Sequence, residues 1–120
     1  AAGLPRAPEA FCAAAADRWS LAAIVTLGAR GSAAADAMHA YRLPAHRVDV
    51  VDTTAAGDAF VGALVASLDR GATLAEALAE GSAAGAHACT RHGAQPSIGP
   101  RSAWQGVARD LPGHLRTISR

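Results

Sequence analysis

Alanine dominates the apolar part of this 120-residue sequence and limits the size of the core that the chain can build. The chain has 33 alanines, whereas leucine, isoleucine, valine and phenylalanine together number 22. That share lies just under the roughly 20% found in disordered chains, but disorder also requires a high net charge. The formal net charge is only +1. We therefore expect one folded, weakly cored domain over residues 1–120.

The basic residues argue against two classes of protein. All 11 are arginine, and a Walker-type phosphate loop needs a lysine, so nucleotide binders of that class are excluded. The arginines are scattered and aromatic residues are few, so nucleic-acid binding is not expected. No apolar stretch is long enough to span a membrane, and the first residues do not resemble a secretory signal. We expect no membrane association and a cytoplasmic location, in which Cys12 and Cys89 stay free thiols.

The first half of the chain predicts a helix followed by strands. Residues 8–19 begin with Pro8 at a first helical position and continue into an alanine-rich run, which favours a helix. The apolar run 21–27 ends at a glycine and predicts a buried strand. Residues 32–44 alternate polar and apolar side chains around a break, which predicts a β-hairpin, and residues 48–52 predict a further strand.

The second half predicts two longer helices. Apolar residues recur at spacings of three and four over residues 56–70, and Gly71 stands where a C-terminal cap belongs. These apolar residues are Phe60, Val61, Leu64, Val65 and Leu68. Thr73 and Glu76 match a capping box, so a second helix is expected to start there and run towards His92. Its glycines and alanines would let another backbone or a flat ligand approach closely.

The remaining segments complete a layered α/β fold. Residues 93–100 have the composition of a loop, and residues 101–110 predict a last helix. The alternation of helices and strands implies layers of helix and sheet, with too few strands for a complete doubly wound sheet. The two tryptophans, Trp19 and Trp104, are expected to anchor packing.

The segment from Asp52 to Phe60 is the strongest candidate for a reaction site. It joins a predicted strand end and a turn of small residues to a helix whose first turn holds Gly57 and Asp58. A helix N-terminus presents unpaired amide groups and the positive end of the helix dipole, so it can bind a phosphoryl group. An ionised Asp58 beside that group could take a proton from an attacking hydroxyl. On these residues alone, an aspartate that merely caps a helix stays open as the alternative.

Three segments of the sequence resemble the ribokinase-like (PfkB-type) carbohydrate kinases. DTTAAGDAFVGAL at residues 52–64 resembles that family's second signature, and TLGARG at 26–31 and TRHGAQPS at 90–97 resemble two further family segments. The resemblance extends over about residues 10–104. It implies a partial ribokinase-like (Rossmann-like) layered sheet with flanking helices, from which the family's N-terminal half and lid are absent.

The resemblance implies a reaction and assigns roles in it. The reaction is ATP-dependent phosphorylation of D-ribose, or of a related sugar, at its primary hydroxyl to give ribose 5-phosphate. Asp58 would be the base and would bind the sugar, and the backbone of Ala55, Ala56, Gly57 and Asp58 would form the anion hole. The implied ATP contacts are Thr26, Leu27, Gly28, Ala29, Arg30, Gly31, Gly57 and Ser82. Ser82 stands where relatives carry Asn or His beside the adenine.

The resemblance also implies two cations, K⁺ and Mg²⁺, besides ATP. A potassium ion beside the anion hole would be held by oxygen ligands, which suit a large, weakly hydrated ion. The implied ligands are Asp52, Thr54, Ala88, Arg91, Gly93 and Ser97. Without the resemblance, Asp52 could instead cap a turn. The family motif that organises Mg²⁺ contains an asparagine, and this sequence has none.

Three roles for the chain follow. The first is a C-terminal portion of a ribokinase-type enzyme, expected to be inactive alone, with a sugar and ATP as partners and a homodimer in full-length relatives. The second is a non-catalytic nucleotide- or anion-binding module. The third is a helix-packing fragment. In all three, the first strand is expected to leave one edge of the sheet unpaired.

Overall fold

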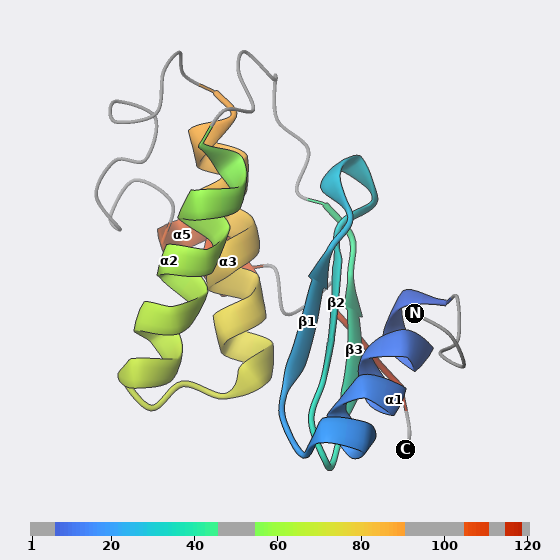
Figure 1. Ribbon diagram of the computed structural model, residues 1–120. Coiled ribbons are helices and arrows are strands. Elements are labelled where there is room, and N and C mark those ends of the chain that lie inside the picture. The colour runs from blue at the N-terminus through green and yellow to red at the C-terminus, as the bar shows by residue number, and fades with distance from the viewer. Residues whose placement is uncertain (1–6, 46–54, 91–104, 111–114, 119–120) are drawn as a thin grey trace.

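A small sheet with helices on both faces forms the molecule, which confirms the predicted layered α/β architecture (Figure 1). This computed structural model describes residues 7–45, 55–90, 105–110 and 115–118. In chain order the elements are α1 (Pro8–Trp19), β1 (Ala23–Thr26), the 3₁₀ turn η1 (Gly28–Arg30), β2 (Ser32–Ala35), β3 (Ala40–Leu43), α2 (Ala56–Asp69), α3 (Leu74–Ala88), α5 (Gln105–Asp110) and β4 (Arg116–Ile118).

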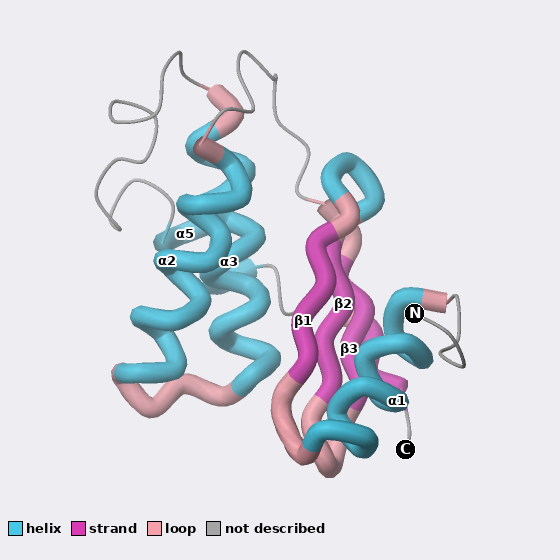
Figure 2. Tube along the Cα trace, viewed as in Figure 1, coloured by secondary structure: helices cyan, strands magenta, loops and turns pink. Residues whose placement is uncertain are grey.

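The described strands form an antiparallel sheet in the order β1-β2-β3-β4 (Figure 2). Its inner strand β2 is buried at all four positions. Ala33 and Ala35 pack into the cluster under α1, whereas Ala34 packs into the cluster formed by α2 and α3. Successive residues of a strand point to opposite faces, so small residues on β2 let helices approach the sheet from both sides.

The predicted hairpin is confirmed as β2 and β3, and Asp36 builds its turn. The Asp36 carboxylate accepts hydrogen bonds from the amides of Met38, at 2.9 Å, and His39, at 2.8 Å. The Asp36 amide in turn donates to the His39 carbonyl at 2.9 Å. An aspartate that binds the amides two and three residues ahead stabilises a tight turn, which fixes the register of the two strands.

The ends of α2 and α3 follow their sequence signals. Gly71 has φ +88°, as a glycine that terminates a helix requires, and α2 stops two residues before it. Thr73 and Glu76 form the predicted capping box at the start of α3. α3 ends at Ala88, short of the predicted His92, which lies outside the described residues.

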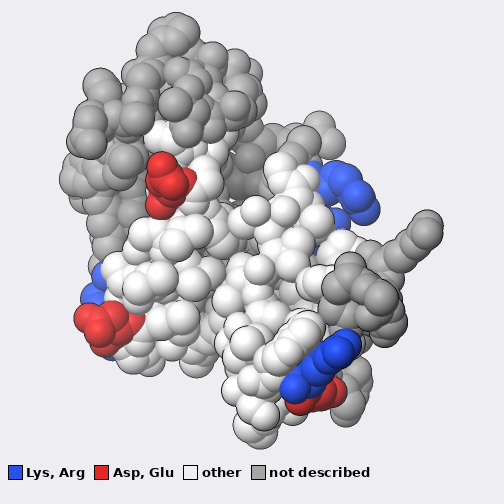
Figure 3. Space-filling model, viewed as in Figure 1, with Lys and Arg blue, Asp and Glu red and all other residues white. Residues whose placement is uncertain are grey.

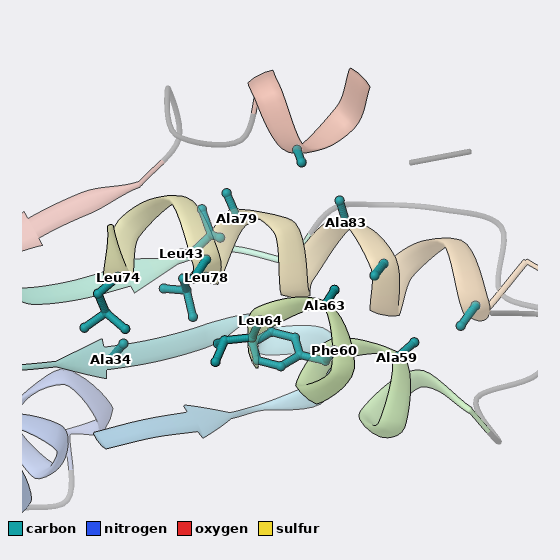
Figure 4. Packing of buried hydrophobic residues seen from close by; sticks show 14 of the residues in the cluster. Ala34, Leu43, Ala59, Phe60, Ala63, Leu64, Leu74, Leu78, Ala79 and Ala83 are labelled. Atoms are coloured by element: carbon teal, nitrogen blue, oxygen red, sulfur yellow. The ribbon is translucent and has the colours of Figure 1, made fainter. Parts of the chain in front are cut away.

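The larger of two hydrophobic clusters joins α2, α3, α5 and the sheet (Figure 4). Phe60 and Leu64 contribute from α2, Leu78 from α3 and Leu43 from β3, and most of the other members are alanines. The cluster therefore depends on close approach of backbones, because alanine side chains cannot fill wide gaps.

Several predictions differ from the structure where contacts between distant residues determine strand length, strand pairing or burial. β1 is shorter than the predicted strand and only partly buried, since within the described sheet it pairs with β2 alone. Trp19 is 52% exposed and lies under the guanidinium of Arg18, so it does not anchor packing. α5 confirms the predicted last helix over Gln105–Asp110, and residues 101–104 lie outside the described residues. β4 was not predicted.

Other sequence predictions concern residues outside the ranges that the structure describes. The predicted strand 48–52, the predicted loop 93–100 and Trp104 lie there. No helix among the described residues combines the length and the hydropathy that crossing a membrane would require.

Candidate functional site

Among the described residues, no side chain caps the backbone amides in the first turn of α2. Ala55 is the N-cap residue, and its side chain makes no capping hydrogen bond. The first intrahelical bond runs from the Ala59 amide to the Ala55 carbonyl at 2.9 Å. The amides of Ala56, Gly57 and Asp58 therefore lack partners within the helix, and the positive end of its dipole lies with them. An alanine N-cap costs about 1 kcal/mol relative to serine or aspartate, and it leaves these amides available.

Gly57 and Asp58 face solvent in this turn. Both residues are exposed, and a Cβ added at Gly57 would meet nothing within 4 Å. No side chain in the described ranges forms an ion pair with Asp58. A carboxylate with no counter-ion next to free amides is accessible to a hydroxyl group and to an anion together.

The start of α3 is an internal contrast to that of α2. Its capping box is complete: the Glu76 amide donates to Thr73 Oγ1 at 3.2 Å, and the Thr73 amide donates to Glu76 Oε1 at 3.0 Å. These bonds with Thr73 lower the pKa of the Glu76 carboxyl. Asp58 holds the same third helical position in α2 as Glu76 in α3, but α2 has no such box. Asp58 is thus not part of a capping box, but an acidic residue in the first turn still stabilises a helix through its dipole, so the alternative of a purely structural aspartate stays open.

The predicted nucleotide segment, residues 26–31, forms the turn from β1 into β2. Gly28 has φ +57° and Gly31 has φ +92°, conformations that glycine adopts without strain. A Cβ at Gly31 would overlap the carbonyl oxygen of Leu43, so the close approach of the end of β3 also requires glycine here. The Leu27 amide closes the turn by donating to the Gly31 carbonyl at 2.8 Å.

Ser82, the other predicted nucleotide contact, lies beside this turn. Its hydroxyl is 3.5 Å from the hydroxyl of Ser32, the first residue of β2. Ser32 is opposite Thr26 in the β1–β2 pair. The fold therefore brings together two predicted contacts that are far apart in the sequence. Sequence reasoning did not single out Ser32, which is buried, because a serine beside a strand carries no recognisable signal.

Of the residues predicted to bind potassium, the structure describes Ala88 alone. Ala88 is buried at the C-terminal end of α3, whereas Asp52, Thr54, Arg91, Gly93 and Ser97 lie outside the described residues. α2 and α3 run antiparallel (Figure 1), so the C-terminus of α3 is at the same end of the pair as the first turn of α2. A helix C-terminus favours a cation. The described residues hold no group of three or more His, Cys, Asp or Glu side chains that could bind a metal.

A polar cluster at the opposite end of the α2–α3 pair was not predicted from the sequence. Glu80 of α3 is 9% exposed and accepts hydrogen bonds from Ser67 and, at 2.6 Å, from Arg70 at the end of α2. Glu80 stands among alanines and leucines on the buried face of α3, and this is the signal that could have identified it. The cluster ties the two helices together far from the proposed reaction site.

Two further features lie away from this site. Cys12 is fully buried under the sheet, and burial, with a smaller contribution from Glu9, raises the pKa of its thiol to about 11. This thiol is unsuited to act as a nucleophile. A surface hollow of about 440 Å³ lies between the end of α1 and the β2–β3 turn. This hollow is at the other end of the molecule from the first turn of α2 (Figure 1).

The sequence matches one known family over most of its length. The family described as pfkB family carbohydrate kinase matches residues 7–100. The chain is also 48% identical over 80 residues to the aminoimidazole riboside kinase of Salmonella typhimurium. That alignment covers 62% of this chain and 25% of the kinase, so the chain spans about a quarter of the length of this relative.

Solved structures show the same fold. A ribokinase from Thermotoga maritima superposes with a TM-score of 0.69 at 30% identity, covering 84% of this chain and 40% of that one. The aminoimidazole riboside kinase from Salmonella enterica, in complex with aminoimidazole riboside and an ATP analogue, gives a TM-score of 0.65 at 41% identity. This second match covers 72% of this chain and 31% of that kinase.

Proposed function

Because this chain belongs to the pfkB family of carbohydrate kinases, we propose that it carries the anion hole and the base of a sugar kinase. The reaction is phosphoryl transfer from ATP to the primary hydroxyl of D-ribose or of a related sugar, including a riboside. The observation that carries the proposal is the first turn of α2, where Ala55 provides no side-chain cap and Asp58 forms no ion pair with any described residue. The substrate class follows the relatives, which include a riboside kinase and a ribokinase.

The residues of the first turn divide the chemistry between them. The Asp58 carboxylate takes the proton of the sugar hydroxyl as its oxygen bonds to the γ-phosphorus of ATP, and the bond from that phosphorus to the bridging oxygen breaks to release ADP. The amides of Ala56, Gly57 and Asp58 stabilise the charge on the phosphoryl oxygens during this transfer. Gly57 has no side chain to keep the phosphoryl group away from them.

We assign ATP to the surface around the β1–β2 turn. The exposed Gly28 and Arg30, and Ser82 on α3, are the groups that would contact the nucleotide. K⁺, if held at the end of α3 by Ala88 and its predicted partners, would supply positive charge beside the anion hole. Activity that is equal in Na⁺ and K⁺ would count against this assignment.

The central experiment combines calorimetry and turnover on the 120-residue chain and its Asp58→Asn variant. We expect ATP to bind both chains with similar affinity, since asparagine keeps the size of the side chain and leaves the backbone amides in place. Any phosphorylation of ribose or of a riboside, with Mg²⁺ and K⁺ present, should fall by at least about 100-fold in the variant. A variant with the wild-type rate would remove Asp58 from the mechanism, and absence of ATP binding by the wild-type chain would overturn the proposal.

A nucleotide- or anion-binding role without transfer is the second candidate. It is favoured by the share of the relatives that the chain covers, which is 25% of the aminoimidazole riboside kinase. ATP binding without turnover on any of the sugars would select this role. Turnover would select the kinase.

A further inference from the structure

Two glycines on α3 stand where α2 comes closest. A Cβ added at Gly81 would lie 3.0 Å from the Phe60 carbonyl oxygen, and one added at Gly85 would lie 3.1 Å from the Ala56 carbonyl oxygen. Real Cβ contacts are rarely this short. Neither glycine has a positive φ, so the approach of α2, and not the local backbone, is what requires them.

The two contacts fall on different parts of α2. Gly81 meets Phe60, in the second turn of the helix, where the backbone is already held by hydrogen bonds on both sides. Gly85 meets Ala56, the first residue of α2 and the neighbour of Gly57 and Asp58. A helix end has fewer backbone bonds than its interior and yields more easily when it is pushed. A side chain at position 85 would therefore move the amides of the anion hole first.

The polar cluster at the other end prevents α2 from relieving such a push by sliding. Ser67, in the last turn of α2, and Arg70, its C-cap residue, both bind Glu80 of α3. Ser67 is fully buried and Glu80 nearly so, which makes this attachment costly to break. With its far end attached, α2 can yield to a bulkier residue 85 only by displacing its first turn.

The geometry points to Gly85 as a positioning residue for the anion hole. Its lack of a side chain seats the first turn of α2 against α3 and so sets where the Gly57 and Asp58 amides meet a phosphoryl group. This inference rests on the proposed function, because it assumes that these amides bind phosphate. Gly81 serves the packing of the helix pair but not the site.

The test compares three substitutions in the 120-residue chain: Gly85→Ala, Gly81→Ala and Gly62→Ala. Gly62 is on α2 with no heavy atom within 4 Å of an added Cβ, so its variant controls for adding a methyl group to a helix. ATP affinity is measured by calorimetry, stability by urea unfolding, and the amide positions by ¹H–¹⁵N spectra without ligand. We expect Gly85→Ala to weaken ATP binding about five-fold, since displacements of an ångström at a reacting centre cost up to about 100-fold.

The controls separate positioning from packing. Gly81→Ala should lose stability as Gly85→Ala does but should bind ATP within about two-fold of the wild-type chain, and Gly62→Ala should gain stability. In the spectra, the Gly57 and Asp58 amides should shift in Gly85→Ala and not in Gly81→Ala. Equal ATP affinities and equal amide shifts in Gly85→Ala and Gly81→Ala would overturn the inference.

Two further outcomes stay informative. If Gly85→Ala does not fold, the same comparison is made in the Gly62→Ala background, which is expected to be more stable. If the wild-type chain binds no ATP, the proposed function fails, and the ligand-free amide shifts alone then decide whether Gly85 seats the first turn.

Discussion

Asp58 and Glu76 occupy equivalent positions in two consecutive helices but are used differently. Glu76 reaches back to the amide of Thr73 and completes a cap. The N-cap before Asp58 is an alanine, which offers no oxygen to the helix amides. Within the described residues, Ala55 therefore leaves the start of α2 without the side-chain cap that Thr73 gives to α3. In α3, the capping box provides hydrogen-bond partners for the backbone amides at the start of the helix.

The capping box predicts that the free energy of unfolding depends on pH through the carboxyl group of Glu76. Hydrogen bonds with Thr73 lower its pKa in the folded chain, so its contribution to stability is present above the unfolded pKa, near 4.5, and is lost as the pH falls through the folded value. Urea unfolding between pH 7 and pH 3 measures this. Glu76→Gln keeps a capping side chain but cannot ionise, so its stability should decline less between about pH 4.5 and pH 3 than that of the wild-type chain. Parallel declines in the two chains would contradict the prediction.

At the scale of elements, α2 and α3 form one unit held at both ends by different means. Near the first turn of α2, the glycines of α3 let the two backbones approach each other. Near the last turn, Ser67 and Arg70 bind the buried Glu80. The middle is filled by Phe60 and Leu64. Close contact and a polar attachment together replace the large side chains that an alanine-rich sequence lacks.

Ser67→Ala tests the polar attachment. The substitution removes a fully buried hydroxyl that donates to Glu80 and leaves that carboxylate with fewer partners, so we expect a loss of about 1–3 kcal/mol in the free energy of unfolding. Urea denaturation measures it. Val61→Ala, an exposed truncation on the same helix, should change the same quantity by less than about 0.5 kcal/mol. An equally small effect of Ser67→Ala would show that the cluster contributes little.

The elements that sequence predicted are those with local signals. Pro8 at the start of α1, Gly71 after α2 and the Thr73 capping box each act within a few residues, and all three appear as expected. β4 has no such signal, because residues 116–118 are too few and too polar to form a pattern and become a strand only by pairing with β3. Long-range pairing is invisible to periodicity.

The same distinction between local signals and long-range contacts applies to the candidate site. The first turn of α2 is one continuous segment, so its free amides and Asp58 could be predicted from local residues. The contact between Ser82 and Ser32 joins residues 50 positions apart, and only the fold brings it about. Ser82 entered the prediction through the family resemblance, not through the residues themselves.

At the scale of the whole molecule, α2 exposes several large apolar side chains. Val61, Val65 and Leu68 were predicted to line a buried face, but they are 57%, 56% and 40% exposed. Their spacing places them about a quarter turn around the helix from Phe60 and Leu64, so the apolar surface of α2 extends beyond its buried side. Figure 3 shows that the described surface on this face of the molecule carries few charges. Within the described strands β1 lies at the edge of the sheet and pairs with β2 alone.

The exposed apolar stripe on α2 predicts that the 120-residue chain associates with itself as its concentration rises, because apolar surface gains from being covered. Sedimentation velocity over a range of concentrations measures this. Val65→Lys places a charge in the middle of the stripe and should lower association while changing the free energy of unfolding by less than about 0.5 kcal/mol, since Val65 is largely exposed. Met38→Lys is the matched control: Met38 is 75% exposed in the β2–β3 turn, away from α2, and its variant should associate like the wild-type chain. Association that Val65→Lys leaves unchanged would exclude the apolar stripe of α2 as the contact.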